Sequence, residues 1–405
     1  MEHATWHGET LVLVILVGTG VYALLSGALS KASITLPMVF VAFGYLLSEP
    51  IGSVSNGIDL SYLQRLIAEI TLVLILFADA SHVRFMSARM NWQLPARMLI
   101  IGLPLTIFLG TLLVYYVNPA AGVGMALLTA AVLTPTDAAL GQAFVSDPRV
   151  PVHLSETINV ESGLNDGLVL PFVIIGAMLA SASLGTAPGG HLAGEIVGQL
   201  TIAPIVGIGF GWGTARLLGL AQDRGWVTDP AQGAVFVTTA FSAFLVSELL
   251  GGNGFIATFV AGMVFGNTFR HNLHFIQEFM EGIGQLLTMA AFLIFGAVLL
   301  PAAIAHVSWV ALIVAVGFLT VVRILPIWIS LTGTGTPAKE KLILGWFGPR
   351  GIASLLFTLI VMQDFEFPAE EELLACVAMT VCLSILAHGV SSAWVAKCTY
   401  GMQNP

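Results

Sequence analysis

The feature that most constrains this chain is a series of long apolar stretches, each bounded by charged residues or by clusters of Gly, Pro and Asn. A helix that crosses a bilayer needs about 20 predominantly apolar residues. Cutting the sequence at these boundaries gives thirteen candidate helices, at residues 9–29, 34–48, 63–81, 97–117, 121–144, 153–182, 192–218, 228–249, 254–268, 283–303, 308–333, 341–363 and 372–398. The sequence therefore predicts an all-α polytopic membrane protein with thirteen transmembrane helices.

The content of charged residues excludes several other classes of protein. Only 9% of the 405 residues are Asp, Glu, Lys or Arg, whereas 57% are hydrophobic. A soluble domain usually contains roughly 25% charged residues, which cover its water-facing surface. A soluble enzyme, a nucleic-acid-binding protein and a disordered chain are therefore excluded.

The positions of the basic residues predict how the helices cross the membrane. Eleven of the 14 basic residues fall in odd-numbered connections or at the C-terminal end, namely Lys31, Arg84, Arg89, Arg97, Arg149, Arg216, Arg224, Arg270, Lys339, Lys341 and Lys397. Cytoplasmic loops are enriched in Lys and Arg. We therefore expect the N-terminus outside and the C-terminus in the cytoplasm. A helix count wrong by one would scramble this alternation.

Acidic residues gather on the opposite face of this topology. They are Glu2, Asp59, Asp364, Glu366, Glu370, Glu371 and Glu372. Two interpretations remain open: solvated outer loops, or a vestibule whose negative potential concentrates cations.

Six charged side chains lie within apolar stretches. They are Asp79, Asp137, Glu161, Asp166, Arg323 and Arg350. A charge at the bilayer centre costs at least ~3 kcal/mol on insertion scales, so such groups face a cavity or a partner and mark ion or proton pathways. Four other titratable residues are interpreted as interfacial: His153, His388, Glu69 and Glu248. A role in tuning the response to pH is the alternative for the two histidines.

The sixth apolar stretch carries two carboxylates on different faces. Ser162 and Asp166 are four residues apart and share one face of a helix, while Glu161 and Asn165 share the neighbouring face about 100° around. One helix therefore presents two carboxylates to two different neighbours.

Two apolar stretches contain residues that interrupt a helix. The fifth contains residues 134–137 (Thr-Pro-Thr-Asp), and the twelfth contains residues 348–351 (Gly-Pro-Arg-Gly). Interrupted helices at matching places in two halves are typical of an ion site at the membrane midplane. The spacing predicts two inverted six-helix repeats, with helix 7 as the connector and helices 5 and 12 discontinuous and crossed.

At these residues the chain resembles the NhaP-type sodium/proton antiporters of the monovalent cation:proton antiporter-1 family. The resemblance is carried by the Thr136-Asp137 pair, residues 161–166 (Glu-Ser-Gly-Leu-Asn-Asp), Arg323 and residues 348–351, in matching order across essentially the whole chain. It implies a secondary active transporter, not an enzyme, in a bacterial inner membrane. This transporter is expected to exchange Na⁺ or Li⁺ for H⁺ by alternating access and to serve pH homeostasis. The implied partners are Na⁺, H⁺, membrane lipid and a second copy in a homodimer, without a cofactor.

The resemblance implies a role for each residue of the ion site. Asp166 is expected to bind the cation and the proton in alternation. Asp137, Ser162, the backbone carbonyl of Thr136 and Asp79 are expected to complete the cation shell. Asp79 departs from those relatives that have Glu at this place.

A second group of residues is expected to support the site. Glu161 resembles the carboxylate that pairs with Arg323 and holds the core together. Asn165 stands where electrogenic relatives carry a second Asp, which implies electroneutral exchange. Arg350 is expected either to neutralise carbonyl groups at a helix C-terminus or to repel the cation during passage.

Alternating access implies two bodies that move against each other. Core transport helices are expected at residues 91–185 (helices 4 to 6) and 306–405 (helices 11 to 13). The dimer-forming scaffold is expected at residues 1–90 (helices 1 to 3) and 186–305 (linker helix 7 and helices 8 to 10).

The physical chemistry of a buried carboxylate explains exchange without reference to any family. Dehydration disfavours the charged carboxylate, so a proton and a cation compete for the same oxygens. An empty site would carry a bare carboxylate through a medium of low dielectric constant, so the two fluxes are coupled.

Three alternatives remain open from the sequence. Ligand types alone do not separate Na⁺ and Li⁺ from K⁺, so a K⁺/H⁺ antiporter of the same fold is one alternative. Asp79, Asp137 and Asp166 could instead supply the dyad of an intramembrane aspartyl hydrolase. Asp137 could also serve as the cap of the second half of helix 5.

Overall fold

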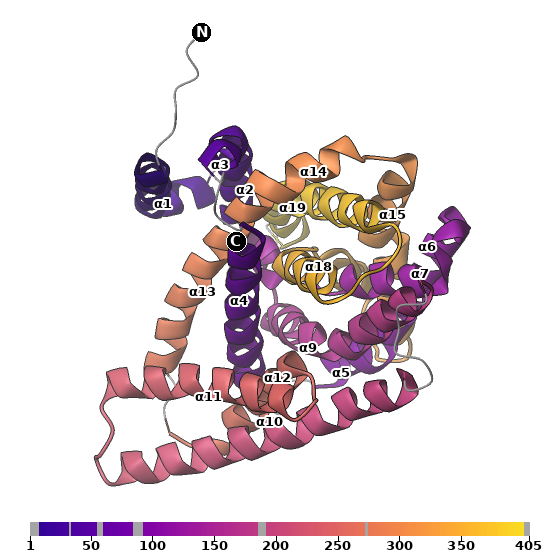
Figure 1. Cartoon of the computed structure of the whole chain (residues 1–405). Helices are drawn as coiled ribbons and strands as arrows, with labels where there is room; N and C mark the ends of the chain where they lie inside the picture. The colour runs from indigo at the N-terminus through magenta and orange to yellow at the C-terminus, as the bar shows by residue number, and fades with distance from the viewer. Residues whose placement is uncertain are drawn as a thin grey trace.

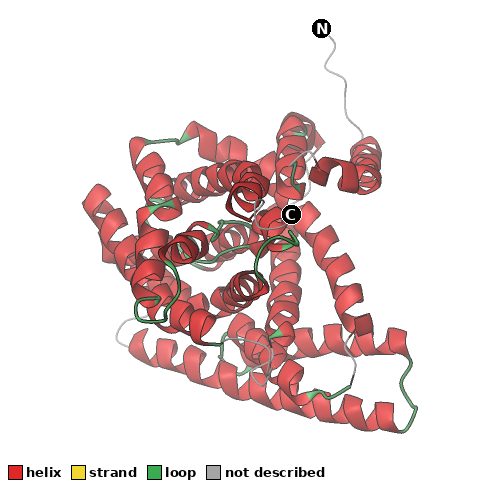
Figure 2. Cartoon of the chain, turned by 180° about the vertical axis from the view of Figure 1, so that it is seen from behind, coloured by secondary structure: helices red, strands yellow, loops and turns green. Residues whose placement is uncertain are grey.

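The structure of the protein is a computed structural model that describes residues 8–31, 34–54, 60–83, 92–184, 192–271 and 274–400. Within these residues the chain forms helices and connecting loops and no β-strand (Figure 2). The expected loop residues Glu2, Asp59, Arg84 and Arg89 lie outside the described residues.

The first half of the chain contains the helices α1 (Gly8–Lys31), α2 (Leu36–Leu46), α3 (Ser48–Val54), α4 (Leu60–His82), α5 (Gln93–Arg97), η1 (Met98–Gly102), α6 (Leu103–Val117), η2 (Pro119–Ala121), α7 (Gly122–Val132), η3 (Ala138–Gly141), α8 (Gln142–Val145) and α9 (Val152–Ala182). The second half contains α10 (Leu192–Asp223), α11 (Asp229–Leu249), α12 (Gly254–Thr268), α13 (His274–Ile294), η4 (Phe295–Leu299), α14 (Leu300–Ala305), α15 (Trp309–Leu319), α16 (Val321–Ser330), α17 (Ala338–Trp346), α18 (Ile352–Asp364) and α19 (Glu370–Tyr400).

Eight helical segments among the described residues are long and apolar enough to cross a membrane. They are Glu9–Leu29, Gln93–Val117, Val152–Ala182, Ile196–Asp223, Asp229–Leu249, Gly282–Ala305, Trp309–Ser330 and Glu370–Thr399. The protein is therefore a polytopic, all-helical integral membrane protein. The count of thirteen spans and the two inverted repeats stay predictions.

The predicted span 308–333 differs from the structure, because it is divided into α15 and α16 at Thr320. The backbone of Thr320 leaves the helical region (φ −123°, ψ −97°), and its hydroxyl donates to the carbonyl of Val316 at 2.5 Å. A Thr that bonds back to its own helix bends that helix. Pro326, inside α16, lacks the N–H that would continue the bonding pattern.

Predicted helices 5 and 12 are interrupted where the sequence suggests. Residues 133–137 separate α7 from η3, and residues 347–351 separate α17 from α18. The two breaks contact each other, because the backbone N–H of Asp137 donates to the carbonyl of Pro349 at 2.8 Å. The chain therefore brings two stretches of non-helical backbone together inside a helical bundle.

Helix packing surrounds these breaks. α7 packs against α6 and α9, and α15 packs against α6 and α19. A second group forms around α12, which packs against α10, α11 and α4, while α13 packs against α2 and α4. Figure 1 shows α9 and α18 in the interior, α10 and α11 along one edge, and α1 at the periphery. The breaks thus lie deep in the bundle.

Candidate ion-binding site

A cavity of about 570 Å³ lies between α4, α9, α13 and the start of α18. All five residues expected at the ion site line it: Asp79, Thr136, Asp137, Ser162 and Asp166. The cavity also reaches His82 and Val83, at the end of α4. Residues from three separate stretches of sequence therefore line one cavity.

Asp166 is the carboxylate whose surroundings are least compensated. Its side chain is 7% exposed, and its Oδ1 has no hydrogen-bond partner among the described residues. Burying an uncompensated carboxylate is expensive, so this group requires a proton or a cation. The α-helical spacing puts Ser162 one turn earlier on the same cavity wall.

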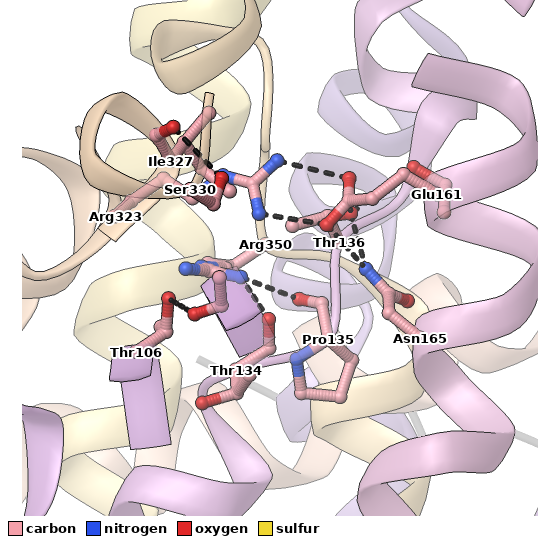
Figure 3. Close-up of polar contacts among 12 residues, drawn as sticks. Thr106, Thr134, Pro135, Thr136, Glu161, Asn165, Arg323, Ile327, Ser330 and Arg350 are labelled. Carbon is pink, nitrogen blue, oxygen red and sulfur yellow. Dashed lines mark hydrogen bonds and ion pairs between the residues drawn. The ribbon is translucent and has the colours of Figure 1, made fainter. Parts of the chain in front are cut away.

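Glu161 faces away from this cavity and forms a buried ion pair with Arg323 of α16. Two parallel hydrogen bonds, of 2.7 and 2.9 Å, join the guanidinium to both carboxylate oxygens (Figure 3). The residues are 2% and 3% exposed, respectively. This bidentate geometry fixes α9 against α16 and compensates both charges.

Thr136 joins the ion pair to the cavity. Asn165 donates from Nδ2 to the Thr136 hydroxyl at 2.6 Å, and that hydroxyl lies 3.2 Å from Glu161 Oε2 and 3.1 Å from Ser162 Oγ. Asn165 does not belong to the cavity lining and contacts it through Thr136 (Figure 3). The two carboxylates of α9 therefore have the two different neighbours that their spacing predicts.

Each helix break supplies a side chain that hydrogen-bonds to unpaired backbone groups at the other break. Arg350, which is fully buried, donates from its guanidinium to the carbonyls of Thr134 and Pro135, just past the C-terminal end of α7 (Figure 3). The carboxylate of Asp137 accepts from the backbone N–H of Ile352 at 3.2 Å, at the start of α18. Each side chain has the charge that the helix dipole favours at the end it contacts.

This geometry bears on two interpretations drawn from the sequence. Arg350 lies where it neutralises helix C-terminal carbonyls, as the first of its two interpretations requires. Asp137 contacts the start of α18, in the other broken helix. The alternative drawn from the sequence was that Asp137 caps the second half of predicted helix 5, its own helix. The cross-contact was not predictable because nothing in the local sequence of either break specifies the register of crossing.

The interfacial interpretation is wrong for His388. Its side chain is fully buried in α19, beside the second break. His153, in contrast, is exposed at the start of α9, with Nε2 3.2 Å from Glu340. The sequence did carry a clue for His388, because Ser384 lies one helical turn earlier on the same face.

A second cavity, of about 440 Å³, lies at the opposite end of α4. Its lining includes Glu69, Glu248, Arg65 and Asp364, and Arg65 bonds to both Glu69 and Asp364 at 2.7 Å. No described residue lines both cavities. Asp166 therefore lines only the first of the two cavities, the one that reaches the end of α4 at His82.

The described residues include no group of three or more His, Cys, Asp or Glu side chains arranged to hold a metal ion. The three aspartates of the cavity thus line one space without forming a closed coordination shell. Residues with hydroxyl groups, Thr136, Ser162 and Thr288, line the same space, and hard oxygen ligands of this kind suit an alkali cation.

Gly351 provides a direct test of the contact between the breaks. A Cβ added there would lie 2.2 Å from Asp137 Oδ2. We expect Gly351→Ala to displace Asp137 and to lower cation-driven proton flux in proteoliposomes on the order of tenfold to a hundredfold. The matched control is Gly141→Ala in the first broken helix, where an added Cβ meets nothing closer than 3.8 Å. Equal activity of the two variants would contradict the prediction.

Carboxylates in a cavity beside two contacting helix breaks, within a polytopic helical bundle, are typical of secondary transporters. The sequence profile described as "Sodium/hydrogen exchanger, transmembrane" matches residues 15–398. The chain therefore belongs to the sodium/hydrogen exchanger family, as its resemblance to NhaP-type antiporters predicted. The family is one of transporters, so the hydrolase alternative is not supported.

Individual relatives agree with this assignment. The chain is 21% identical over 383 residues to the K⁺/H⁺ antiporter NhaP2 of Shewanella oneidensis, covering 94% of this chain and 65% of that protein. It is 25% identical over 415 residues to the Na⁺/H⁺ antiporter NhaG of Bacillus atrophaeus, covering 96% and 75%. The chain thus spans 65% of the length of the Shewanella protein.

A solved structure shares the fold. The sodium proton antiporter MjNhaP1 from Methanocaldococcus jannaschii, at pH 8, superimposes with a TM-score of 0.74 over 97% of this chain and 99% of that chain. The sequences are 17% identical, so the comparison establishes the fold alone.

Proposed function

We propose that this protein exchanges Na⁺ or Li⁺ for H⁺ across a bacterial cell membrane, electroneutrally and by alternating access. The observation that carries the proposal is the Asp166 carboxylate, which is buried in a cavity and has an oxygen without a hydrogen-bond partner among the described residues. This carboxylate requires a positive charge whenever it is shielded from water. Either H⁺ or the cation supplies it, and competition for one site gives exchange.

Two separate cavities support alternating access. The first reaches the end of α4 that the positive-inside pattern assigns to the cytoplasm, and the second lies at the other end of α4. Asp166 lines the first cavity, while Leu170, one turn further along α9, lines the second. An inward-facing state has this arrangement, and the outward-facing state would connect Asp166 to the second cavity.

The proposal includes the thirteen-helix topology. Adding α4 and the four shorter apolar helices (Leu36–Leu46, Pro119–Val132, Gly254–Thr268 and Ile352–Asp364) to the eight long segments gives thirteen. The core of residues 91–185 and 306–405 and the scaffold of residues 1–90 and 186–305 follow the packing groups around α7 and α12. The homodimer rests on the family resemblance.

A K⁺/H⁺ antiporter is the second candidate function. The observation that favours it is that relatives from Shewanella and from Alkalimonas amylolytica are named K⁺/H⁺ antiporters, whereas the Bacillus relative is named a Na⁺/H⁺ antiporter. The three ions differ in size rather than in preferred ligand type, so the dimensions of the occupied site decide between them.

Transport by purified protein in proteoliposomes tests the proposal. Na⁺, Li⁺ and K⁺ are added separately while the lumenal pH is followed, with and without a clamped membrane potential. We expect Na⁺ and Li⁺ to drive H⁺ flux that does not depend on the potential. A response to K⁺ alone would show that the transported cation is K⁺ rather than Na⁺ or Li⁺. Flux that follows the membrane potential would show that exchange is not electroneutral. Absence of any cation-driven H⁺ flux would overturn antiport.

Asn165 provides the test of stoichiometry. Its Nδ2 lies 3.4 Å from Glu161 Oε1, so Asn165→Asp would set two carboxylates side by side. Like charges at this distance cause one of them to take up a proton, and that proton can move with each transport cycle. We expect exchange by this variant to depend on membrane potential, or its thermal stability to fall. Asn165→Ala is the control for loss of the amide. Unchanged stability and continued insensitivity to potential would show that this position does not set the stoichiometry.

A further inference from the structure

We propose that Ser384 and His388 of α19 are positioning residues for the cation site. They hold the second helix break, residues 347–351, in the place where it binds Asp137. This inference rests on the proposed function, because it concerns the same site.

His388 fixes the first end of the break. It is fully buried, and its Nε2 lies 2.9 Å from the carbonyl oxygen of Trp346, the last residue of α17. A carbonyl only accepts hydrogen bonds, and each ring nitrogen faces one, because Nδ1 lies 3.0 Å from the carbonyl oxygen of Ser384 in the same helix. We place the hydrogen on Nε2, the tautomer that joins α19 to α17. This bond satisfies a carbonyl at the C-terminal end of a helix.

Ser384 fixes the other end of the break. Its hydroxyl oxygen accepts from the backbone N–H of Arg350 at 2.7 Å and lies 3.2 Å from His388 Nδ1. With the hydrogen of the imidazole on Nε2, Nδ1 accepts the hydroxyl hydrogen of Ser384. A continuous chain of hydrogen bonds thus runs from Trp346 through His388 and Ser384 to Arg350.

The segment held by this chain is the one that contacts Asp137. Pro349 accepts from the backbone N–H of Asp137 at 2.8 Å, and Ile352 donates to its carboxylate at 3.2 Å. Those two contacts lie on either side of Arg350 in the sequence. A shift of the break would therefore move Asp137, although neither α19 residue lines the cavity.

Ser384 and His388 contact the backbone of the break region, whereas Ser391 accepts only from the side chain of Trp346, at 3.1 Å. Two other buried polar side chains of α19 bond only within their own helix. Thr380 donates to Cys376 at 2.6 Å, and Ser392 donates to the carbonyl of His388 at 2.5 Å. Like Ser384, Ser392 is fully buried. Ser392 is thus a matched control for Ser384 on the same helix.

The test compares Ser384→Ala, His388→Asn and His388→Gln with Ser392→Ala, using Na⁺-driven H⁺ flux in proteoliposomes, or K⁺ if the wild type responds to K⁺ alone. We expect Ser384→Ala and His388→Asn to raise the apparent KM for the cation about tenfold, the effect of losing one hydrogen bond. The maximal rate should change less than KM. His388→Gln, whose longer side chain can still donate to Trp346, should restore a KM close to that of the wild type. Ser392→Ala should leave KM unchanged.

A binding measurement accompanies the flux assay. Cation-dependent thermal stabilisation in detergent should shift to higher cation concentration in Ser384→Ala and His388→Asn, and not in Ser392→Ala. In the Gly351→Ala background, where Asp137 is already displaced, Ser384→Ala should raise KM little further.

Several results would overturn the inference. They are a KM in Ser384→Ala and His388→Asn equal to that of the wild type, an equal effect of His388→Asn and His388→Gln, and an additive effect in the Gly351→Ala background. If the variants at one of the two positions fail to fold, KM is compared with the wild type at the other position, because the hydrogen-bond chain passes through both residues. A wild-type protein without cation-driven flux would instead overturn the proposed function and leave the thermal-shift comparison to test the positioning role.

Discussion

Asp166→Asn removes cation-driven proton exchange, down to the level of vesicles without protein. The amide can neither take up a proton nor compensate the charge of a cation, so the competition on which exchange depends disappears. The neighbouring ion pair does not involve this side chain, so we expect the variant to fold. Lumenal pH measurements in proteoliposomes and size-exclusion chromatography in detergent check the two parts.

Asp223→Asn is the control for this experiment. Asp223 is an exposed residue at the end of α10, 3.3 Å from His271, and its replacement should leave exchange unchanged. Robust flux in Asp166→Asn would remove this residue from the centre of the site. The search would then move to Asp137 and Asp79, the other carboxylates of the cavity.

Removing one partner of the Glu161–Arg323 pair should have the largest effect on stability. Either Glu161→Gln or Arg323→Gln leaves an uncompensated charge at a position that is 2–3% exposed, and this costs on the order of 3–5 kcal/mol. The double variant should be more stable than either single variant, because no charge then remains unpaired. Unfolding of the purified protein in detergent gives the comparison. Additive losses in the double variant would show that the two residues do not act as a pair.

Loss of transport in these single variants would not assign them a chemical role. Glu161 contacts Thr136, which lines the cavity, so a disturbance of the ion pair reaches the site through that hydroxyl. The double variant separates the effects: recovered stability with recovered flux indicates a structural pair. Recovered stability without flux indicates that the charges also act on the transported ion.

Much of the candidate site was predictable because its geometry follows from a single helix. The four-residue spacing of Ser162 and Asp166 sets them on one face, and that of Glu161 and Asn165 sets them on the next. The structure has these pairs on the cavity and on the Arg323 side, respectively. Local backbone geometry alone decides which face of a helix each side chain lies on.

Other features could not be predicted because they depend on contacts between distant segments. The break at Thr320 has no Gly or Pro at that position. Ser384 and His388 share one helix face, but nothing in the sequence shows that this face meets residues 347–351. The contact of Asp137 with Ile352 joins residues 215 positions apart. Helix propensity and hydropathy carry no information about such pairings.

The sequence by itself determined that this protein is an integral membrane protein, that four charged side chains are buried within it (Glu161, Asp166, Arg323 and Arg350), and which family it belongs to. Those properties follow from hydropathy, from the expense of burying charge and from helical periodicity, all of which act locally. Only the tertiary structure decided three contacts. Asp137 accepts a hydrogen bond at the start of α18, Arg350 donates to carbonyls at the end of α7, and α19 holds the second break. The reason is that unpaired backbone groups at a helix break must find partners, and packing determines which side chains are within reach.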